Sequence, residues 1–253
     1  MRKIKKVNKL YRMVRYSKLI ILLVVGIIAV SCLFPLGRSK ARWLISQWWA
    51  RQVLNALGVE MVVEGDQGDL KGPLVIISNH ISWVDIPVIL ALFKVHFVSK
   101  SDIKSWPIIG FLAAKTGTIF LEKKNKRSLP NVVKTLGEAL DENKKILLFP
   151  EGTTGRGDSV LPFRSPLLEV AVKSKTSVVP IAIRYFNHDS SPNFSAAYVD
   201  DDTFMKTLVR IVSAPVTKVK VNIAGMIYPE HTDRKNLAMK LRDQVQFFFT
   251  QET

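Results

Sequence analysis

Residues 73–92 read PLVIISNHISWVDIPVILAL and contain the pattern from which the fold class follows. The apolar run at 73–79 predicts a buried strand, because a strand covered on both faces of a sheet is apolar throughout. A short polar loop follows, and Pro87 then falls in the first turn of a predicted helix over 84–93, where proline is tolerated. A buried strand followed directly by a helix is typical of α/β proteins.

The same alternation runs through the rest of the chain. It predicts further strands at 59–65, 96–100, 116–121, 145–150, 177–183 and 218–227. It predicts further helices at 105–114, 128–142, 166–175 and 232–250. Residues 187–202 are the most loop-like stretch, and no linker divides the chain after residue 58. We therefore expect one α/β domain at 58–253, with a mostly parallel sheet covered by helices and with ligand sites where strands end.

Composition and charge narrow the class of protein. The 253-residue chain has 47% hydrophobic and 23% charged residues, which excludes a disordered or low-complexity protein. A single cysteine excludes a disulfide scaffold and a zinc site built from several thiolates. With 37 lysines and arginines against 21 aspartates and glutamates, the net charge of +16 indicates an anionic partner, for which membranes and nucleic acids are the two choices.

The basic charge is concentrated at the N-terminus, next to the most apolar stretch of the chain. Residues 1–18 hold eight basic residues and no acidic one, and residues 19–34 (LIILLVVGIIAVSCLF) carry no charge. As a helix, this apolar stretch spans about 24 Å at ~1.5 Å per residue, against a bilayer core of about 30 Å. Three alternatives remain open: a cleaved signal peptide, a single-span anchor, and a helix that dips into the membrane and returns.

The following segment, residues 39–58, favours the third alternative. Three tryptophans and two flanking arginines lie close together: Trp43, Trp48, Trp49, Arg42 and Arg51. This combination suits the headgroup layer of a bilayer, whereas the alternative is a helix that buries its tryptophans in the core. We predict that residues 1–57 bind a membrane with anionic lipids. No nucleic-acid motif accompanies the basic cluster, so a nucleic-acid partner is not expected.

The first candidate site follows the strand at 73–79. His80 and Asp85 are five residues apart, which on a regular helix leaves them on different faces. They meet only if His80 lies in the loop and Asp85 in the first turn of the next helix. A carboxylate held against a histidine fixes its tautomer and stabilises the imidazolium, so such a pair acts as a general base. The alternative is an N-cap aspartate beside an incidental loop histidine.

Two further strand ends carry polar residues. Residues 149–165 (FPEGTTGRGDSVLPFRS) contain glycines whose amides can turn toward an anion, while Arg156 and Arg164 can donate charge-assisted hydrogen bonds. Residues 117–127 end in a run of basic side chains. The alternatives are a solvated glycine-rich turn and a solvated charged face. Neither a P-loop nor a dinucleotide fingerprint is present.

Taken in order, these residues resemble the four motifs of the glycerolipid acyltransferases, above all the bacterial 1-acylglycerol-3-phosphate acyltransferases. The matching motifs are Asn79-His80-x4-Asp85, Gly117-x-x-Phe120, Phe149-Pro150-Glu151-Gly152-Thr153 and Val179-Pro180. The resemblance covers roughly residues 58–230. The first and third motifs, about 65 residues apart, are its specific part.

The resemblance implies direct transfer of an acyl group from acyl-CoA or acyl-carrier protein to the free hydroxyl of lysophosphatidic acid, giving phosphatidic acid. It implies that His80 is the general base and that Asp85 orients it, and the chain has no G-x-S-x-G elbow for a covalent intermediate. The substrate-binding residues that it implies are Gly117, Phe120, Lys123, Glu151, Gly152, Thr153, Arg156, Arg164 and Pro180. No cofactor and no metal are expected. The remaining histidines are expected to be structural or at the surface: His96, His188 and His231.

Two positions depart from the family pattern. Lys123 and Thr154 stand where the second and third motifs commonly have arginine. Both changes fall on groups expected to hold the phosphate of the acceptor, so the sequence leaves open which lysolipid is the acceptor. Sequences that read E-G-T-T resemble acyltransferases that complete ornithine-type lipids, which makes lyso-ornithine lipid the alternative acceptor. A lipid ester or thioester hydrolase and a non-enzymatic membrane- or nucleic-acid-binding protein are further alternatives.

The expected donors are cytosolic, and this bears on the topology. A simple span with its N-terminus inside would place His80 on the outer side, away from the donor. We therefore expect the protein at the inner membrane, with the catalytic domain facing the cytoplasm and an N-terminal helix that enters the bilayer and returns.

Overall fold

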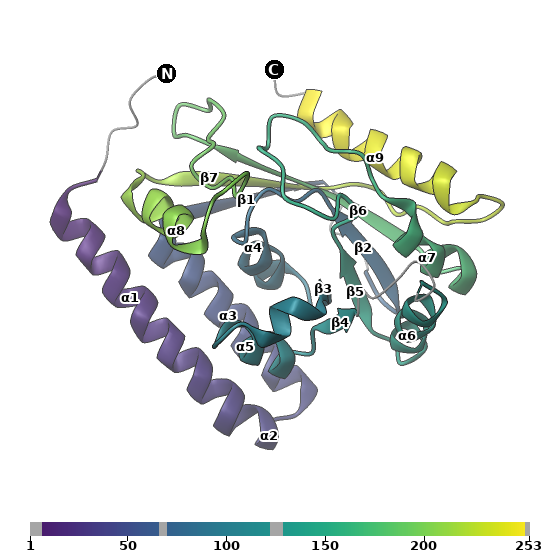
Figure 1. The fold of residues 1–253 in the computed structure, drawn as a ribbon, viewed down its shortest axis with the longest axis horizontal. Coiled ribbons are helices and arrows are strands. Elements are labelled where there is room, and N and C mark those ends of the chain that lie inside the picture. The colour runs from purple at the N-terminus through teal and green to yellow at the C-terminus, as the bar shows by residue number, and fades with distance from the viewer. Residues whose placement is uncertain (1–6, 66–69, 122–128, 251–253) are drawn as a thin grey trace.

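The computed structural model describes residues 7–65, 70–121 and 129–250, and a seven-stranded sheet lies at their centre (Figure 1). Its strands are β1 (Val59–Gly65), β2 (Leu74–Ser78), β3 (His96–Lys100), β4 (Ile119–Leu121), β5 (Lys145–Leu148), β6 (Val178–Phe186) and β7 (Thr217–Ile223). They lie in the order β1-β7-β6-β2-β5-β3-β4, and all neighbours are parallel except β6 and β7. The predicted mostly parallel α/β sheet is confirmed.

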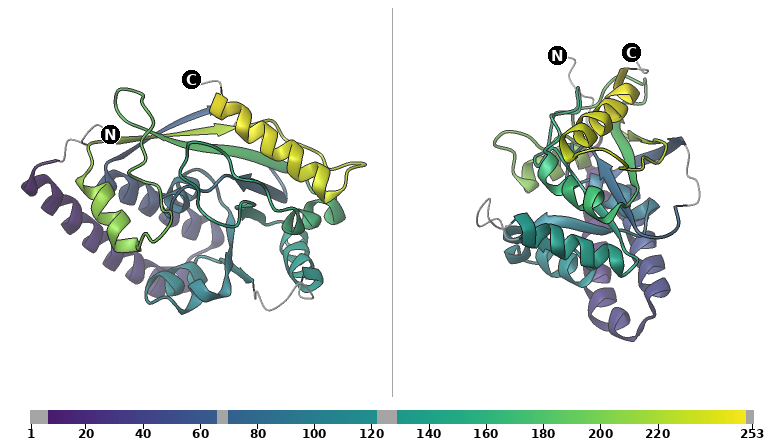
Figure 2. Two further views of the ribbon diagram at one scale, coloured as in Figure 1. Left: turned by 45° about the horizontal axis from the view of Figure 1, so that its top comes forward. Right: turned by 90° about the vertical axis from the view of Figure 1, so that its right-hand side faces the viewer.

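Helices cover both faces of the sheet (Figure 2). One face carries α3 (Ser39–Leu57), α4 (Asp85–Leu92) and α8 (Phe204–Ser213). The other carries α6 (Leu129–Asp141), α7 (Glu169–Ser174) and α9 (Arg234–Thr250). The remaining helices are α1 (Lys9–Ile28), which packs outside α3, the short α2 (Phe34–Leu36), and α5 (Ile109–Lys115). Single helical turns of other types span Ala29–Leu33, Ser101–Ser105 and Ser165–Leu168.

The pleat of the central strands builds a separate core on each face. In β2, Leu74 and Ile76 pack with α3 and α4, whereas Val75 and Ile77 pack with α6, α7 and α9. Every residue of β2 is buried. A strand with two buried faces is largely apolar on both of them, and this is why a continuous apolar run identified it.

Several elements differ from the sequence prediction. β7 ends at Ile223, four residues before the predicted end at residue 227, and β4 begins at Ile119, not at residue 116. β6 continues to Phe186, beyond the predicted end at residue 183, because Arg184 and Tyr185 find hydrogen-bond partners inside the protein. α8 occupies a stretch for which the sequence predicted no element. It forms because Ile211 and Val212 of its inner face are buried against the sheet.

The N-terminal helices form an antiparallel pair (Figure 1). Helical backbone continues from α1 through α2 to Leu36, and the chain then turns into α3. Trp49 of α3 donates a hydrogen bond from Nε1 to the main-chain carbonyl of Leu22, 2.7 Å away. Its ring lies directly on Gly26, where an added Cβ would be 2.9 Å from Nε1. Trp49 therefore joins the two helices, as the alternative of a packed tryptophan has it, whereas Trp48 is 51% exposed.

Residues Lys9–Leu36 form a helical segment that is long and apolar enough to cross a membrane, with a mean hydropathy of 3.0 over its most apolar window. This N-terminal segment is a candidate membrane segment, as the sequence predicted. α3 ends at Leu57 and β1 begins at Val59, beside the predicted boundary, while α3 packs closely on α4. The division into a membrane-binding unit and a catalytic domain stays a prediction.

Arg15, one of the eight basic residues near the N-terminus, is buried in the protein. Its Nη1 donates hydrogen bonds to the main-chain carbonyls of Val212 and Ala214, at 3.0 and 2.8 Å. These carbonyls lie at the C-terminal end of α8, where a cation is favoured by the helix dipole. Arg15 therefore fastens α1 to the α/β domain, and its charge is not available to lipid headgroups.

Candidate active site

β2 delivers His80 into a loop at the carboxyl end of the sheet, and α4 begins at Asp85. Nδ1 of His80 lies 2.8 Å from Oδ2 of Asp85. The side chain of His80 is 20% exposed, whereas that of Asp85 is wholly buried. The predicted meeting of a loop histidine with an aspartate in the first turn of the next helix is confirmed.

The carboxylate of Asp85 accepts four hydrogen bonds. Oδ2 accepts from the main-chain N–H groups of Ile81 and Ser82, at 2.7 and 2.9 Å, as well as from His80. Oδ1 accepts from the hydroxyl of Tyr185 at 2.7 Å. Because an ionised carboxylate only accepts, Nδ1 of His80 carries its proton and Nε2 keeps a free lone pair. The imidazole is thus oriented as a base at Nε2.

The ring and the backbone of this loop are fixed by separate contacts. Phe149 stacks on the imidazole of His80, with ring centroids 3.9 Å apart and an interplanar angle of 13°. The side chain of Asn79 pairs with the main chain of Ile183, donating to its carbonyl at 2.9 Å and accepting from its N–H at 2.8 Å. The histidine therefore sits on a rigid support, which is what positioning a reacting group requires.

Glu151 is buried and joins two loops. Its Oε2 accepts from the main-chain N–H of His80 and its Oε1 from that of Leu161, each at 3.0 Å. Burial raises the pKa of the Glu151 carboxyl to about 7, and the two main-chain donors oppose that rise. The carboxyl group to which the resemblance gave a part in substrate binding is therefore engaged with the backbone of His80 and Leu161.

The glycine-rich loop after β5 packs on the His80 loop. The N–H of Gly155 donates to the carbonyl of His80 at 2.7 Å, and the N–H of Gly152 donates to the carbonyl of Phe149 at 3.0 Å. These two amides are used inside the protein, so they do not face an anion as the sequence predicted. The hydroxyl of Thr154 donates to the carbonyl of Tyr198 in the long loop after β6.

Basic side chains of the same loop lie at its surface. Arg156 and Arg164 are exposed, as is Thr153. The Arg164 side chain lies over Gly152, where an added Cβ would be 3.3 Å from its Nε. Gly152 has φ +70°, in the left-handed region that favours glycine. The loop that contains Glu151 thus presents two guanidinium groups to solvent.

The other predicted site residues lie in the sheet or beside it. The carbonyl of Gly117 accepts a hydrogen bond from Nδ1 of His96 at 2.8 Å, which gives this histidine a structural partner. Phe120 is half-buried in β4, opposite Ser99 of β3. Pro180 is buried in β6, and its carbonyl accepts from the N–H of Ala224. Among the described residues, no hydrogen bond joins these positions to His80. Lys123 lies outside the described residues.

Sequence reasoning missed Tyr185 altogether and did not give Asn79 or Phe149 a role of its own. The sequence feature that indicates a role for Tyr185 is the run VVPIAIRYF, in which this tyrosine comes near the end of an apolar strand. A tyrosine hydroxyl in such a place must find a partner, because an unpaired buried hydroxyl is costly.

Comparison with known proteins identifies the family. Residues 56–184 match the model of the family described as Acyltransferase. A lyso-ornithine lipid O-acyltransferase of Pseudomonas aeruginosa is 32% identical over 207 residues, which are 82% of this chain and 79% of that protein. The chain belongs to the acyltransferase family. This acyltransferase is also similar to a 1-acyl-sn-glycerol-3-phosphate acyltransferase of Neisseria meningitidis, at 28% identity over 77% of this chain and 76% of that protein.

The fold of the acyltransferase matches a solved structure along almost its whole length. The 1-acyl-sn-glycerophosphate (LPA) acyltransferase PlsC from Thermotoga maritima superposes with a TM-score of 0.73. The superposed region includes 96% of this chain and 95% of the PlsC chain, at 19% sequence identity. The match extends over the N-terminal helices as well as the sheet, so the whole architecture is that of PlsC.

Proposed function

We propose that this acyltransferase moves a fatty acyl group from a cytosolic thioester, acyl-CoA or acyl-carrier protein, to the free hydroxyl of a lysolipid. The observation that carries the proposal is the His80–Asp85 pair, in which Nδ1 is held by a buried carboxylate and the partly exposed ring offers Nε2. A base of this kind commonly contributes about 10²–10⁴ in rate.

The reaction needs no covalent intermediate on the protein. Nε2 of His80 takes the proton of the acceptor hydroxyl as its oxygen attacks the thioester carbonyl carbon. The C–S bond then breaks, and the departing thiolate takes the proton back from Nε2. Asp85 stabilises the imidazolium that exists between the two steps. Cys32 is exposed in the apolar N-terminal segment, far along the chain from this site, and is given no part in the reaction.

As the acceptor we propose lysophosphatidic acid. The loop next to the histidine presents two exposed guanidinium groups, those of Arg156 and Arg164, and guanidinium groups suit a phosphate through charge-assisted hydrogen bonds. This proposal is also supported by the Neisseria relative and its printed name.

Thr154 supports a second candidate, lyso-ornithine lipid. Its hydroxyl is bonded to the carbonyl of Tyr198, so the position is occupied by a short side chain that serves the loop contact and offers no cation to a phosphate. Two relatives at 32% identity, from Pseudomonas aeruginosa and Rhizobium meliloti, carry the name lyso-ornithine lipid O-acyltransferase.

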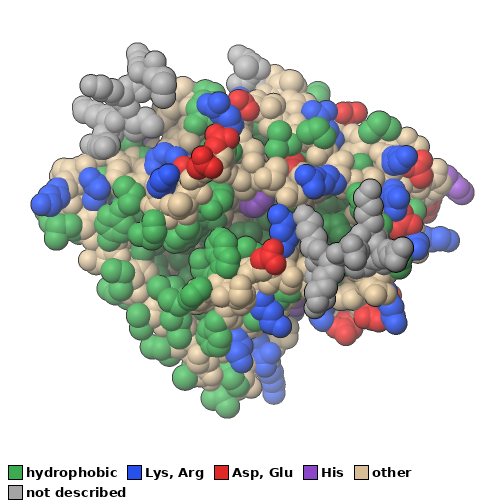
Figure 3. Space-filling model, in the orientation of Figure 1, with side chains coloured by type: hydrophobic (Ala, Val, Ile, Leu, Met, Phe, Trp, Pro, Cys, Tyr) green, Lys and Arg blue, Asp and Glu red, His purple; other side chains and the backbone are tan. Residues whose placement is uncertain are grey.

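We further propose that the protein sits on one leaflet of the inner membrane with His80 facing the cytoplasm. Hydrophobic side chains gather over α1, α5 and α8 on the face seen in Figure 3, which is hollowed between α8 and α5. The exposed apolar residues of α1 include Ile20, Ile21, Val24 and Ile28. The antiparallel return of α3 keeps both ends of the helical pair next to the catalytic domain. The basic N-terminal segment suits anionic lipids on that leaflet.

Washed membranes that contain the protein, its His80→Ala variant, or a His231→Ala control test these proposals. His231 is exposed and lies outside the site. Each preparation receives labelled acyl-CoA or acyl-carrier protein together with lysophosphatidic acid or lyso-ornithine lipid. Label in phosphatidic acid that disappears only with His80→Ala supports the first acceptor, and label in ornithine lipid alone supports the second. Release of free fatty acid without any lysolipid would instead identify a hydrolase.

A further inference from the structure

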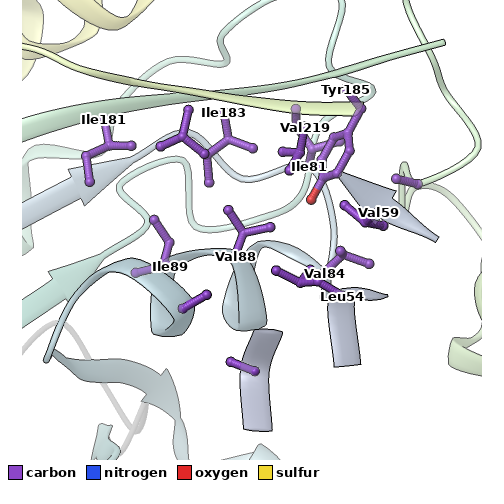
Figure 4. Packing of buried hydrophobic residues seen from close by; sticks show 14 of the residues in the cluster. Leu54, Val59, Ile81, Val84, Val88, Ile89, Ile181, Ile183, Tyr185 and Val219 are labelled. Carbon is purple, nitrogen blue, oxygen red and sulfur yellow. The ribbon is translucent and has the colours of Figure 1, made fainter. Parts of the chain in front are cut away.

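The hydroxyl of Tyr185 is the only side-chain donor to Oδ1 of Asp85 among the described residues. Tyr185 lies on β6 and is 2% exposed, and its oxygen is 2.7 Å from Oδ1. Figure 4 shows its ring among buried apolar residues of the sheet and of the loop before α4, with the hydroxyl directed toward the α4 side. A donor placed in such surroundings is ordered by its packing, and the hydrogen bond to a buried carboxylate is strong.

This hydrogen bond completes the set of donors around the carboxylate. The other three donors all approach Oδ2, from His80, Ile81 and Ser82. Without the phenol, Oδ1 would be buried without a hydrogen bond from a side chain, and the negative charge would fall more heavily on the oxygen that faces the imidazole. The position of the carboxylate would also depend on the loop alone.

We propose that Tyr185 is a positioning residue for the acyl-transfer reaction: it holds Asp85 from the side opposite His80 and sets the basicity of the imidazole through that carboxylate. This inference rests on the proposed role of His80 as general base.

The strand β6 supports both ends of the catalytic loop. Two residues before Tyr185, the main chain of Ile183 pairs with the side chain of Asn79, at the start of the loop. Tyr185 then binds Asp85 at the start of α4. Because these contacts come from one strand in the middle of a sheet, the spacing between histidine and aspartate is imposed by a rigid element.

The charged and titratable groups near the pair limit what a pH profile can report. Tyr185 itself remains protonated, since burial and the neighbouring Asp85 raise its pKa well above its usual value. Glu151 contacts the backbone of His80 and has a pKa of about 7, and Arg242 of α9 acts on Glu151. The protonation of Glu151 therefore affects a pH profile of activity as well as that of His80. For this reason the imidazole of His80 has to be observed directly.

The test uses Tyr185→Phe, which keeps the ring and removes the hydroxyl, with Tyr228→Phe as the matched control. Tyr228 is 65% exposed. In detergent micelles, ¹⁵N-histidine NMR follows the titration of His80, assigned by the resonance that His80→Gln lacks. Steady-state kinetics give kcat and KM for the acyl donor.

We expect the midpoint of the His80 titration to rise by about 0.5–1 pH unit in Tyr185→Phe, because the carboxylate becomes a stronger acceptor. We expect kcat at neutral pH to fall about tenfold, with KM for the donor unchanged. The control should match the wild-type protein in both measurements. An unchanged His80 titration in folded Tyr185→Phe would overturn the proposal, even if the variant unfolds at a lower temperature.

A wild-type measurement guards against failure of the variant to fold. The Tyr185 hydroxyl proton should be protected from solvent exchange and should shift as His80 titrates, and a proton that does neither also overturns the proposal. If the wild-type protein transfers no acyl group, the proposed function fails, whereas the NMR titration still reports whether Tyr185 acts on His80.

Discussion

The indole Nε1 of Trp49 donates a hydrogen bond to the main-chain carbonyl of Leu22, across the interface between the two N-terminal helices. The carbonyl belongs to the apolar half of α1 and the indole to a helix rich in polar residues. The pair therefore behaves as a helical hairpin held by a specific contact.

Trp49→Phe should lower the free energy of unfolding by about 1 kcal/mol, because it removes one hydrogen bond and keeps an aromatic ring. Trp48→Phe is the matched control on the next residue, since Trp48 is half exposed. Thermal unfolding followed by circular dichroism compares the two variants. Equal stability of both would show that the Trp49–Leu22 contact does not hold the hairpin.

Arg15→Met should lower the free energy of unfolding by about 2–3 kcal/mol, because two carbonyls at the end of α8 lose a charged donor. Lys18→Met also removes one cation from α1, at an exposed position, and should have little effect. Hydrogen exchange of α1 measures the difference. Unchanged protection of α1 in Arg15→Met would contradict the assigned role.

Asp85→Asn should lower kcat by about 10²–10⁴. The neutral amide no longer stabilises the imidazolium, and its NH₂ group either replaces the acceptor of the Tyr185 hydroxyl or faces the three donors at Oδ2. Asp141→Asn, at the exposed end of α6, is the control and should retain full activity. Activity of Asp85→Asn within twofold of the wild type would exclude the dyad mechanism.

Glu151→Gln should remove one pH-dependent component of stability. The pKa of Glu151 is raised from 4.5 to about 7 in the folded protein, so the folded state binds a proton more tightly than the unfolded state. Its contribution is fully present below about pH 4.5 and is lost as the pH rises toward 7, a change of about 3 kcal/mol from the size of the shift.

The Glu151→Gln variant should therefore gain stability relative to the wild type between pH 5 and pH 8. Thermal midpoints at the two pH values measure this difference, and Glu138→Gln, on the exposed face of α6, should show none of it. A stability difference that stays constant with pH would show that Glu151 is already ionised at pH 5.

Local sequence pattern was sufficient for the sheet and for the central pair of the site. Nearly continuous apolar runs, such as LVIIS in β2, indicate a strand that is buried on both faces. In the H-x4-D motif, the histidine and the aspartate come into contact only if a loop precedes the helix. Both properties are determined within about ten residues of the chain.

The end of β6 and the support of the site depend on distant residues, and a local pattern does not contain them. A charged residue such as Arg184 is typical of a strand end, yet Arg184 is buried. It donates to the carbonyl of Phe249, and its guanidinium lies 5.2 Å from the ring centroids of Phe186 and Phe249. Tyr185 is buried because Asp85, 100 positions earlier, accepts a hydrogen bond from its hydroxyl. In α8, β-branched residues lower helix propensity, and tertiary packing outweighs it.

The docking of Arg15 onto α8 also has a consequence for synthesis of the chain. Its acceptor carbonyls follow 197 and 199 residues later, so α1 leaves the ribosome long before its binding surface exists. At about 5–20 residues per second, the delay is about 10–40 s. During this time the apolar helix has to be shielded by a bilayer or a chaperone, and membrane targeting is therefore expected to begin while the enzyme is still being translated.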